Sequence, residues 1–264
     1  TVGYSANALG GAGGPLAVLI IAIVAAELGK AVSKETKVDI LVTPLVTIFA
    51  GVGLSMLIAA PIGAAASQVG TLIMWATEQA PLVMGILVSV IVGVALTLPI
   101  SSAAICAALG LTGLAGGAAV AGCCAQMVGF AVMSYKENGV GGLVSQGLGT
   151  SMLQMGNIIK NPRIWIAPTL ASAITGPLAT CLFHFEMNGA AVSSGMGTCG
   201  LVGQIGVYTG WVSDIAAGTK AAITPMDWAA MVLLCFVLPA VLSVVFCEVE
   251  RKLGWIKDGD LKLN

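Results

Sequence analysis

The amino-acid sequence predicts an all-α, polytopic integral membrane protein with roughly six to eight transmembrane helices and additional Gly-rich, broken helices that re-enter the membrane. Composition is the first reason, because 58% of the 264 residues are hydrophobic, 9% are charged and the mean hydropathy is +1.00. A soluble domain has about a quarter of its residues charged. The second reason is that residues 40–77 and 79–135 contain no charged side chain. Each run is long enough to cross a bilayer, since a spanning helix takes about 20 residues.

The length of the apolar runs indicates helices rather than strands. The strands of a membrane barrel are only about ten residues long and alternate apolar with polar side chains. Only helices and closed barrels satisfy all backbone hydrogen bonds in hydrocarbon. In chain order, we expect membrane helices over residues 15–28, 40–60, 81–99, 115–135, 164–185 and 228–246.

Four further apolar pieces are too short or too rich in glycine to be regular spans, and they cover residues 62–77, 101–114, 140–159 and 190–210. We expect them to be re-entrant or interfacial. The 35 glycines of the chain favour close backbone approach, and five prolines interrupt or end helices: Pro44, Pro61, Pro99, Pro168 and Pro177. Non-helical backbone at membrane depth is tolerated only where it faces protein or a water-filled cavity. This combination favours a transporter over a simple membrane anchor.

Basic residues mark the expected membrane edges. We expect one membrane domain over residues 1–247 and a polar tail over residues 248–264. The tail carries Arg251, Lys252, Lys257 and Lys262, so the positive-inside tendency predicts a cytoplasmic C-terminus on the same side as Arg163. Other basic residues at membrane edges are Lys30, Lys34, Lys37, Lys136 and Lys160. Because the sequence starts at Thr1 and not at Met, we expect a processed or truncated start.

Several function classes lack their sequence signatures. The net charge of −1 and the lack of a basic patch argue against nucleic acid as a partner. The seven cysteines lie in apolar stretches without a C-x-x-C spacing or a nearby histidine, so we expect no metal site. There is no P-loop, no G-x-S-x-G and no H-E-x-x-H motif. We therefore expect no cofactor and no catalytic residue, and enzymatic activity of this chain by itself stays uncertain.

The strongest candidate for a binding site surrounds the single histidine of the chain. His184, Glu186 and Asn188 lie at the end of an expected membrane helix, just before a Gly/Ser-rich stretch. Ionisable side chains in a membrane are costly and usually functional. A carboxylate accepts hydrogen bonds from neighbouring hydroxyl groups, while an amide and an imidazole both donate and accept. The three residues thus suit a polyol such as a sugar, although an ordinary solvated loop explains the spacing equally well.

Uncharged amide side chains within the apolar runs provide further candidates. Gln126, Gln146, Asn157 and Gln204, together with Gln154, need hydrogen-bond partners when they are buried. They either bond between helices, which is the commoner role of a lone membrane glutamine, or line a hydrated path. Their distribution over several segments favours the path.

Five blocks carry a resemblance to a known family: residues 98–103 (LPISSA), 126–130 (QMVGF), 138–143 (NGVGGL), 161–170 (NPRIWIAPTL) and 195–205 (GMGTCGLVGQI). In this order they resemble the second enzyme-IIC-type family of the bacterial sugar phosphotransferase system. The resemblance implies a sugar-binding subunit in the bacterial cytoplasmic (inner) membrane, often a homodimer, which presents its solute to cytoplasmic IIA/IIB-type phosphocarriers. It also matches Glu186 and His184 to sugar-holding residues, although the Gly-Ile-Thr-Glu motif of glucose-type members does not occur here, and it implies that N-terminal helices are missing.

We therefore expect a sugar- or polyol-translocating subunit with alternating access. One alternative is a channel, facilitator or sensor that has the same fold and works without a phosphocarrier. A lipid-binding scaffold or intramembrane enzyme is a further alternative, which depends only on Glu186 and His184 being buried.

Overall fold

The computed structural model describes residues 14–34 and 38–263, and within these ranges every regular element is a helix. The expectations for the start of the chain and for Lys37 lie outside the described residues. The chain divides into two compact units, Thr1–Thr71 with Ala107–Leu109 and Leu72–Cys106 with Gly110–Asn264. Four helical stretches of the described residues are long and apolar enough to cross a membrane: Asp39–Gln79, Gly113–Met133, Pro162–Leu182 and Pro225–Lys252. The predicted polytopic, all-α membrane fold is confirmed.

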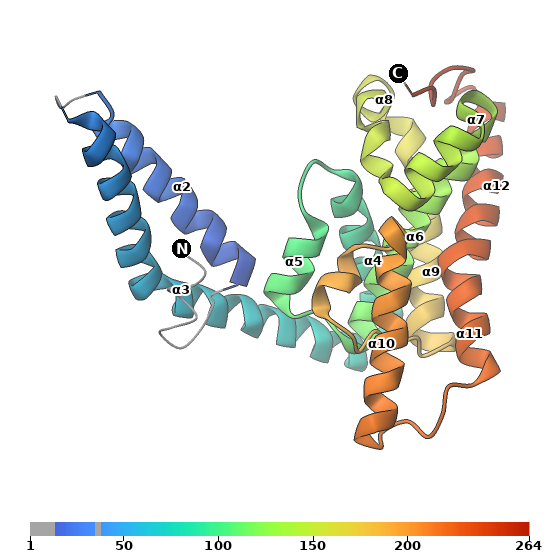
Figure 1. Cartoon of the computed structure of the whole chain (residues 1–264). Helices are drawn as coiled ribbons and strands as arrows, with labels where there is room; N and C mark the ends of the chain where they lie inside the picture. Colours follow the sequence, from blue (N-terminus) through green and yellow to red (C-terminus); the bar gives the residue numbers. More distant parts are fainter. Residues whose placement is uncertain (1–13, 35–37, 264) are drawn as a thin grey trace. The chain divides into compact units, whose positions relative to one another are not determined.

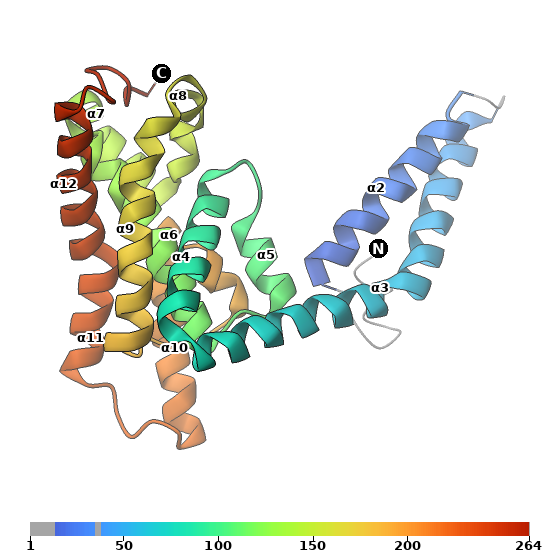
Figure 2. The ribbon, with the colours of Figure 1, turned by 180° about the vertical axis from the view of Figure 1, so that it is seen from behind.

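The first unit contains helix α2 (Gly14–Val32) and most of helix α3 (Asp39–Gln79), which is 41 residues long. Ala17 and Ile21 of α2 are buried with Ala59 of α3 in a small apolar cluster. Figures 1 and 2 show that α3 bends sharply near its middle. The sequence predicts a break near Pro61, and there the helical hydrogen bonding continues without interruption. Membrane helices tolerate proline because neighbouring groups satisfy the carbonyl that loses its donor.

The second unit is a bundle around helix α6 (Gly113–Met133), which is almost entirely buried. Helix α4 (Pro81–Thr97), helix α9 (Ile166–Pro177) and helix α12 (Leu238–Lys252) all contact α6 (Figures 1 and 2). Helix α9 is extended at its two ends by the turns η3 (Pro162–Trp165) and η4 (Leu178–Leu182). Helix α11 (Pro225–Val232) and the π-helical turn η7 (Leu233–Val237) lead into α12 and complete the span Pro225–Lys252.

Small residues let α4, α6 and α9 approach closely. A methyl group at Gly122 of α6 would overlap the carbonyl oxygen of Ser89 on α4, and one at Gly176 of α9 would overlap that of Gly85. The Ser89 hydroxyl donates to the Ser172 carbonyl oxygen at 2.8 Å. Membrane helices associate through such close packing and interhelical hydrogen bonds. The glycine content of the chain is thus used for helix packing as well as for breaks.

Broken helices occur where the Gly-rich pieces predict them. Residues 101–114 form helix α5 (Ser102–Leu109) and a loop. Residues 190–210 form two 3-10 turns, η5 (Ala191–Gly195) and η6 (Cys199–Leu201), and then helix α10 (Val202–Ala217). Residues 140–159 are divided among four short elements, α7 (Tyr135–Val144), η1 (Ser145–Gly149), η2 (Ser151–Gln154) and α8 (Met155–Lys160). The prediction is wrong for residues 62–77, which are regular helix within α3.

Glu250 on α12 provides a prediction about stability. Its side chain is 4% exposed, and among the described residues neither carboxylate oxygen has a hydrogen-bond partner. Burying a carboxyl group without a partner costs free energy, so an apolar side chain of similar size is expected to stabilise the bundle by about 1–4 kcal/mol. We expect Glu250→Met to raise the unfolding temperature in detergent. Glu248→Met is the control, because Glu248 is half-exposed and pairs with Lys136 at 3.0 Å. A lower unfolding temperature for Glu250→Met would contradict this explanation.

Candidate functional site

A pocket of about 470 Å³ lies in the second unit, between the loop that follows η4, helix α10 and the start of helix α11. The loop after η4, the second half of α10 and the start of α11 lie at the end of the bundle opposite to α7, α8 and the last residues of the chain (Figure 1). The lining of the pocket combines aromatic, acidic, amide and cationic side chains: Phe183, His184, Phe185, Glu186, Asn188, Trp211, Asp214, Thr219, Lys220, Met226, Asp227 and Ala230. The three residues that the sequence singles out around the histidine all line it.

The loop at residues 183–189 is fixed to the bundle by backbone hydrogen bonds. His184 adopts a left-handed conformation with φ of 42°, which turns the chain away from the preceding helix. The Phe185 amide then donates to the Ala179 carbonyl oxygen at 2.8 Å. Met187 and Gly113, at the start of α6, exchange two backbone hydrogen bonds of 3.0 Å each. The loop is therefore held in place although it has no regular structure.

Glycines on α6 and α10 provide the space that this loop occupies. A methyl group at Gly117 of α6 would overlap the Phe185 carbonyl oxygen. On α10, a methyl group at Gly210 would meet the amide nitrogens of Asn188 and Gly189 at 2.8 Å each. The backbone of the loop thus lies directly on two helices, and this contact sets the position of Glu186 and Asn188.

Asn188 connects the two acidic side chains at the mouth of the pocket. Its amide nitrogen donates to Glu186 Oε2 at 3.0 Å and to Asp214 Oδ2 at 2.9 Å. Within the described residues, the second oxygen of each carboxylate makes no hydrogen bond. These two oxygens are acceptors that a bound hydroxyl group can use. His184 is also exposed in the pocket.

An ion pair also lines the pocket. Lys220 Nζ lies 2.8 Å from Asp227 Oδ1, and both side chains are mostly buried, at 28% and 21% exposure. The other oxygen of Asp227 accepts from the amide and hydroxyl groups of Thr224 in a capping box at the start of α11. Lys220 also lies over the Trp211 ring, 5.8 Å from its centroid. Both carboxylate oxygens of Asp227 therefore already have partners, and the ion pair orients Lys220.

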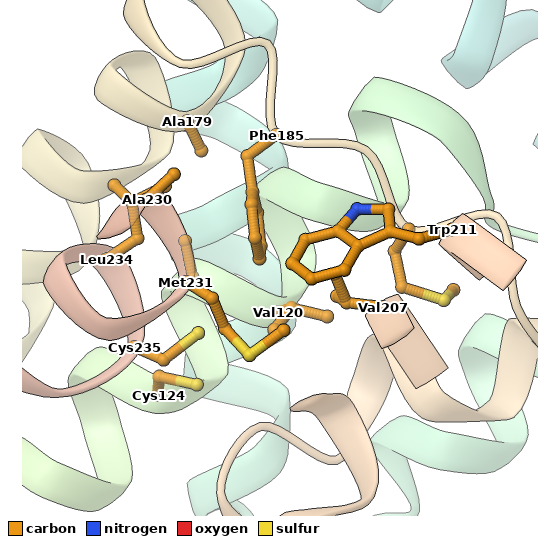
Figure 3. Close-up of a cluster of buried hydrophobic side chains, with 12 residues drawn as sticks. Val120, Cys124, Ala179, Phe185, Val207, Trp211, Ala230, Met231, Leu234 and Cys235 are labelled. Atoms are coloured by element: carbon orange, nitrogen blue, oxygen red, sulfur yellow. The ribbon is translucent and has the colours of Figure 1, made fainter. Parts of the chain in front are cut away.

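The floor of the pocket is apolar. Phe185, Trp211 and Ala230 line the pocket and also belong to a buried cluster, in which Figure 3 shows the Phe185 and Trp211 rings next to each other. Trp228 meets the edge of Trp211 with ring centroids 5.5 Å apart. The floor is thus largely aromatic, whereas the charged and amide side chains line the rest of the pocket.

The other predicted site residues lie elsewhere in the bundle. The Gln126 carbonyl group accepts from Thr97 and from the Trp165 indole at 3.0 Å, between α4, α6 and the turn η3. Gln146 and Asn157 lie at the end of the bundle opposite to the pocket, where Gln154 connects them. Gln204 donates to Cys124 Sγ at 3.2 Å, and its carbonyl oxygen is buried without a partner among the described residues. The structure brings none of these four together with Glu186.

Asp214, Lys220, Asp227 and the aromatic floor are site residues that the sequence reasoning missed. The sequence did contain a signal for Asp214, Lys220 and Asp227. Charged residues are rare in this chain, and these three lie close together in the sequence. Among the described residues, no group of three possible metal ligands occurs.

Comparison with known proteins agrees with the blocks found in the sequence. A family model described as phosphotransferase system, EIIC, matches residues 2–263. Comparisons with curated proteins and with solved structures gave no match. The family match covers nearly the whole chain, including both the pocket and the bundle that holds it. The chain therefore belongs to the phosphotransferase system EIIC family, and it is a multi-pass membrane subunit of sugar transport.

Proposed function

We propose that the pocket binds a sugar or polyol and that the chain delivers this solute to cytoplasmic IIA/IIB-type phosphocarriers. The observation that carries the proposal is the pairing of two carboxylates around Asn188 with an aromatic floor, in one cavity of about 470 Å³. This volume is within the range of about 300–1,000 Å³ that small-molecule sites have. Glu186 and Asp214 accept hydrogen bonds from hydroxyl groups, while the apolar face of a sugar ring packs against Phe185 and Trp211.

The distribution of charges supports an orientation in the membrane. Lys136 pairs with Glu248 near the end of α12, and Arg163 lies 5.6 Å from the Trp255 ring centroid, so basic side chains gather at the end of the bundle away from the pocket. We propose that this basic end faces the cytoplasm of a bacterial cell, in its inner membrane. The pocket is then at the outer end, and the described conformation is the one that receives solute.

The proposal is tested with the purified full chain in detergent and in vesicles. Calorimetric titration with a panel of neutral sugars and polyols is expected to give binding to at least one of them. Uptake into vesicles is then compared with and without phosphocarriers and a phosphate donor. Phosphocarrier-dependent accumulation of phosphorylated solute supports delivery. Equal uptake without phosphocarriers would indicate a facilitator instead of a phosphocarrier-dependent transporter. Bound acyl chains together with no solute binding would favour a lipid-binding scaffold.

We further propose that the subunit works as a homodimer, as the family resemblance implies. The expected result is twice the mass of one chain by light scattering of the protein–detergent complex, after correction for detergent. A mass of one chain at all concentrations used for transport would contradict it.

A further inference from the structure

A segment that follows helix α12 is folded back onto the end of the bundle opposite to the pocket (Figures 1 and 2). We refer to residues 253–263 as the strap. Two of its side chains, Ile256 and Leu261, are 3% and 0% exposed and belong to an apolar cluster with Phe130 and Ile164. The strap therefore covers this end of the bundle.

Amide side chains hold the strap by its backbone. Asn138 donates to the Leu261 carbonyl oxygen and accepts from the Leu263 amide, both at 2.8 Å. Asn161 donates to the Trp255 carbonyl oxygen at 2.9 Å. These bonds do not depend on the identity of the strap side chains. Two strap side chains are also held, since Asp260 accepts from Asn161 and Asp258 pairs with Arg251, at 2.9 Å each.

Next to the strap, buried amides form a ladder that ends at Ser134, the C-cap of α6. Asn157 donates to Gln154 Oε1 at 2.8 Å, Gln154 to Gln146 Oε1 at 2.9 Å, and Gln146 to Ser134 Oγ at 2.8 Å. All four side chains are at most 9% exposed. The first two amides also donate to the strap, at the carbonyl oxygens of Lys262 and Leu261, at 2.9 Å each. Two members of this polar ladder are thus hydrogen-bonded directly to the strap.

The ladder is connected to the pocket through the broken helix at residues 191–201. The Thr198 hydroxyl donates to the carbonyl oxygen of Gly147, the neighbour of Gln146. Gly203 donates to the Gly197 carbonyl oxygen at 3.0 Å, and one turn later Gly206 lies against the backbone of Gly189 in the pocket loop. Polar and glycine contacts therefore follow one another from the strap to Asn188.

We propose that the strap is a gate, which closes the end of the bundle away from the pocket and opens that end to water when it is released. Buried amide networks are stable only while every member has a partner, and here two of the partners are carbonyl oxygens of the strap. Release hydrates Gln154 and Asn157 and gives water access to Ser134. The proposal that the strap opens and closes is argued from these contacts alone. The further idea that solute leaves the protein at this end rests on the proposed function.

The test uses Ser134→Cys as a reporter, because Ser134 is 0% exposed and ends the series of amide hydrogen bonds that starts at the strap. The reaction of this thiol with a water-soluble maleimide is followed in the full-length protein, with the same chain lacking Ser134→Cys as background. Leu261→Asp is introduced to release the strap, and Leu253→Asp is its control, because Leu253 is 58% exposed in the same segment. We expect labelling at least about tenfold faster with Leu261→Asp, which is the rate change for a tenfold larger open population. Labelling as slow as in the control would overturn the gate.

A second variant is needed because Leu261→Asp could be labelled faster merely by unfolding the protein. Asn138→Asp keeps the size and the acceptor for Leu263 but replaces the donor to Leu261 by a carboxylate oxygen. It is expected to accelerate labelling by a smaller factor while the unfolding temperature stays near that of the parent. Unchanged labelling with Asn138→Asp would also contradict the gate. The assay contains no solute, so it fails or succeeds independently of whether the pocket binds sugar.

Discussion

Replacing Gly117 by alanine is expected to remove solute binding, with affinity lowered at least about a hundredfold, which corresponds to roughly 2.7 kcal/mol. The added methyl group would overlap the carbonyl oxygen of Phe185, and this atom is backbone, which cannot rotate away. The loop must therefore move off helix α6. Its bonds between Met187 and Gly113 are then strained, and Glu186 leaves its place beside Asp214.

Gly156→Ala is the matched control, because Gly156 is also helical but a methyl group there would meet no atom within 4 Å. This control is expected to bind solute normally and to be slightly more stable, since alanine favours helix by about 1 kcal/mol over glycine. The measurements are calorimetric titration and the unfolding temperature of both variants. Normal affinity in Gly117→Ala would show that the loop position does not control the pocket.

Glu186→Gln is the second substitution with a large expected effect, namely the loss of measurable solute binding without unfolding. Glutamine has the same shape and keeps a carbonyl oxygen for Asn188, so the loop stays folded. The charge is lost, and hydrogen bonds to charged groups are worth about 1.5–3 kcal/mol, which makes affinity at least about tenfold weaker for each bond. Binding is measured with the solute identified in the sugar panel.

The control for this substitution is Glu78→Gln, because Glu78 is exposed near the end of α3 and does not line the pocket. It is expected to bind as the parent does. If Glu186→Gln also binds the true solute with unchanged affinity, Glu186 is not part of the site, and the proposed role of the pocket has to be abandoned.

The helical membrane fold was predictable because lipid leaves little choice for a chain with so few charges. Even the broken pieces at residues 140–159 and 190–210 were predictable, since glycine runs weaken helices at particular places. The continuity of α3 through Pro61 was not, because whether a proline ends a membrane helix depends on which neighbouring groups satisfy the backbone. Local sequence determines whether a segment is helical, whereas the point at which a helix ends depends on tertiary contacts.

The candidate site was predictable only in its local part. His184, Glu186 and Asn188 are close in sequence, so their proximity follows from chain connectivity. Asp214 and Lys220 reach them only because α10 turns back along the loop, which residue spacing does not reveal. The amides show the same difference. The sequence says that Gln146 and Asn157 need partners, but the partner of Asn157 in the strap is more than 100 residues away.

The span Pro225–Lys252 has a consequence for how the two ends of the bundle can move. Its first turns contribute Met226, Asp227 and Ala230 to the pocket, and its last turn leads directly into residues 253–263. Its 28 residues measure about 42 Å, with the π-helical turn Leu233–Val237 near the middle. If this turn keeps its shape while the span tilts about it, the cavity wall and the opposite terminus shift in opposite directions, so widening one side of the molecule narrows the other without any further signal between them.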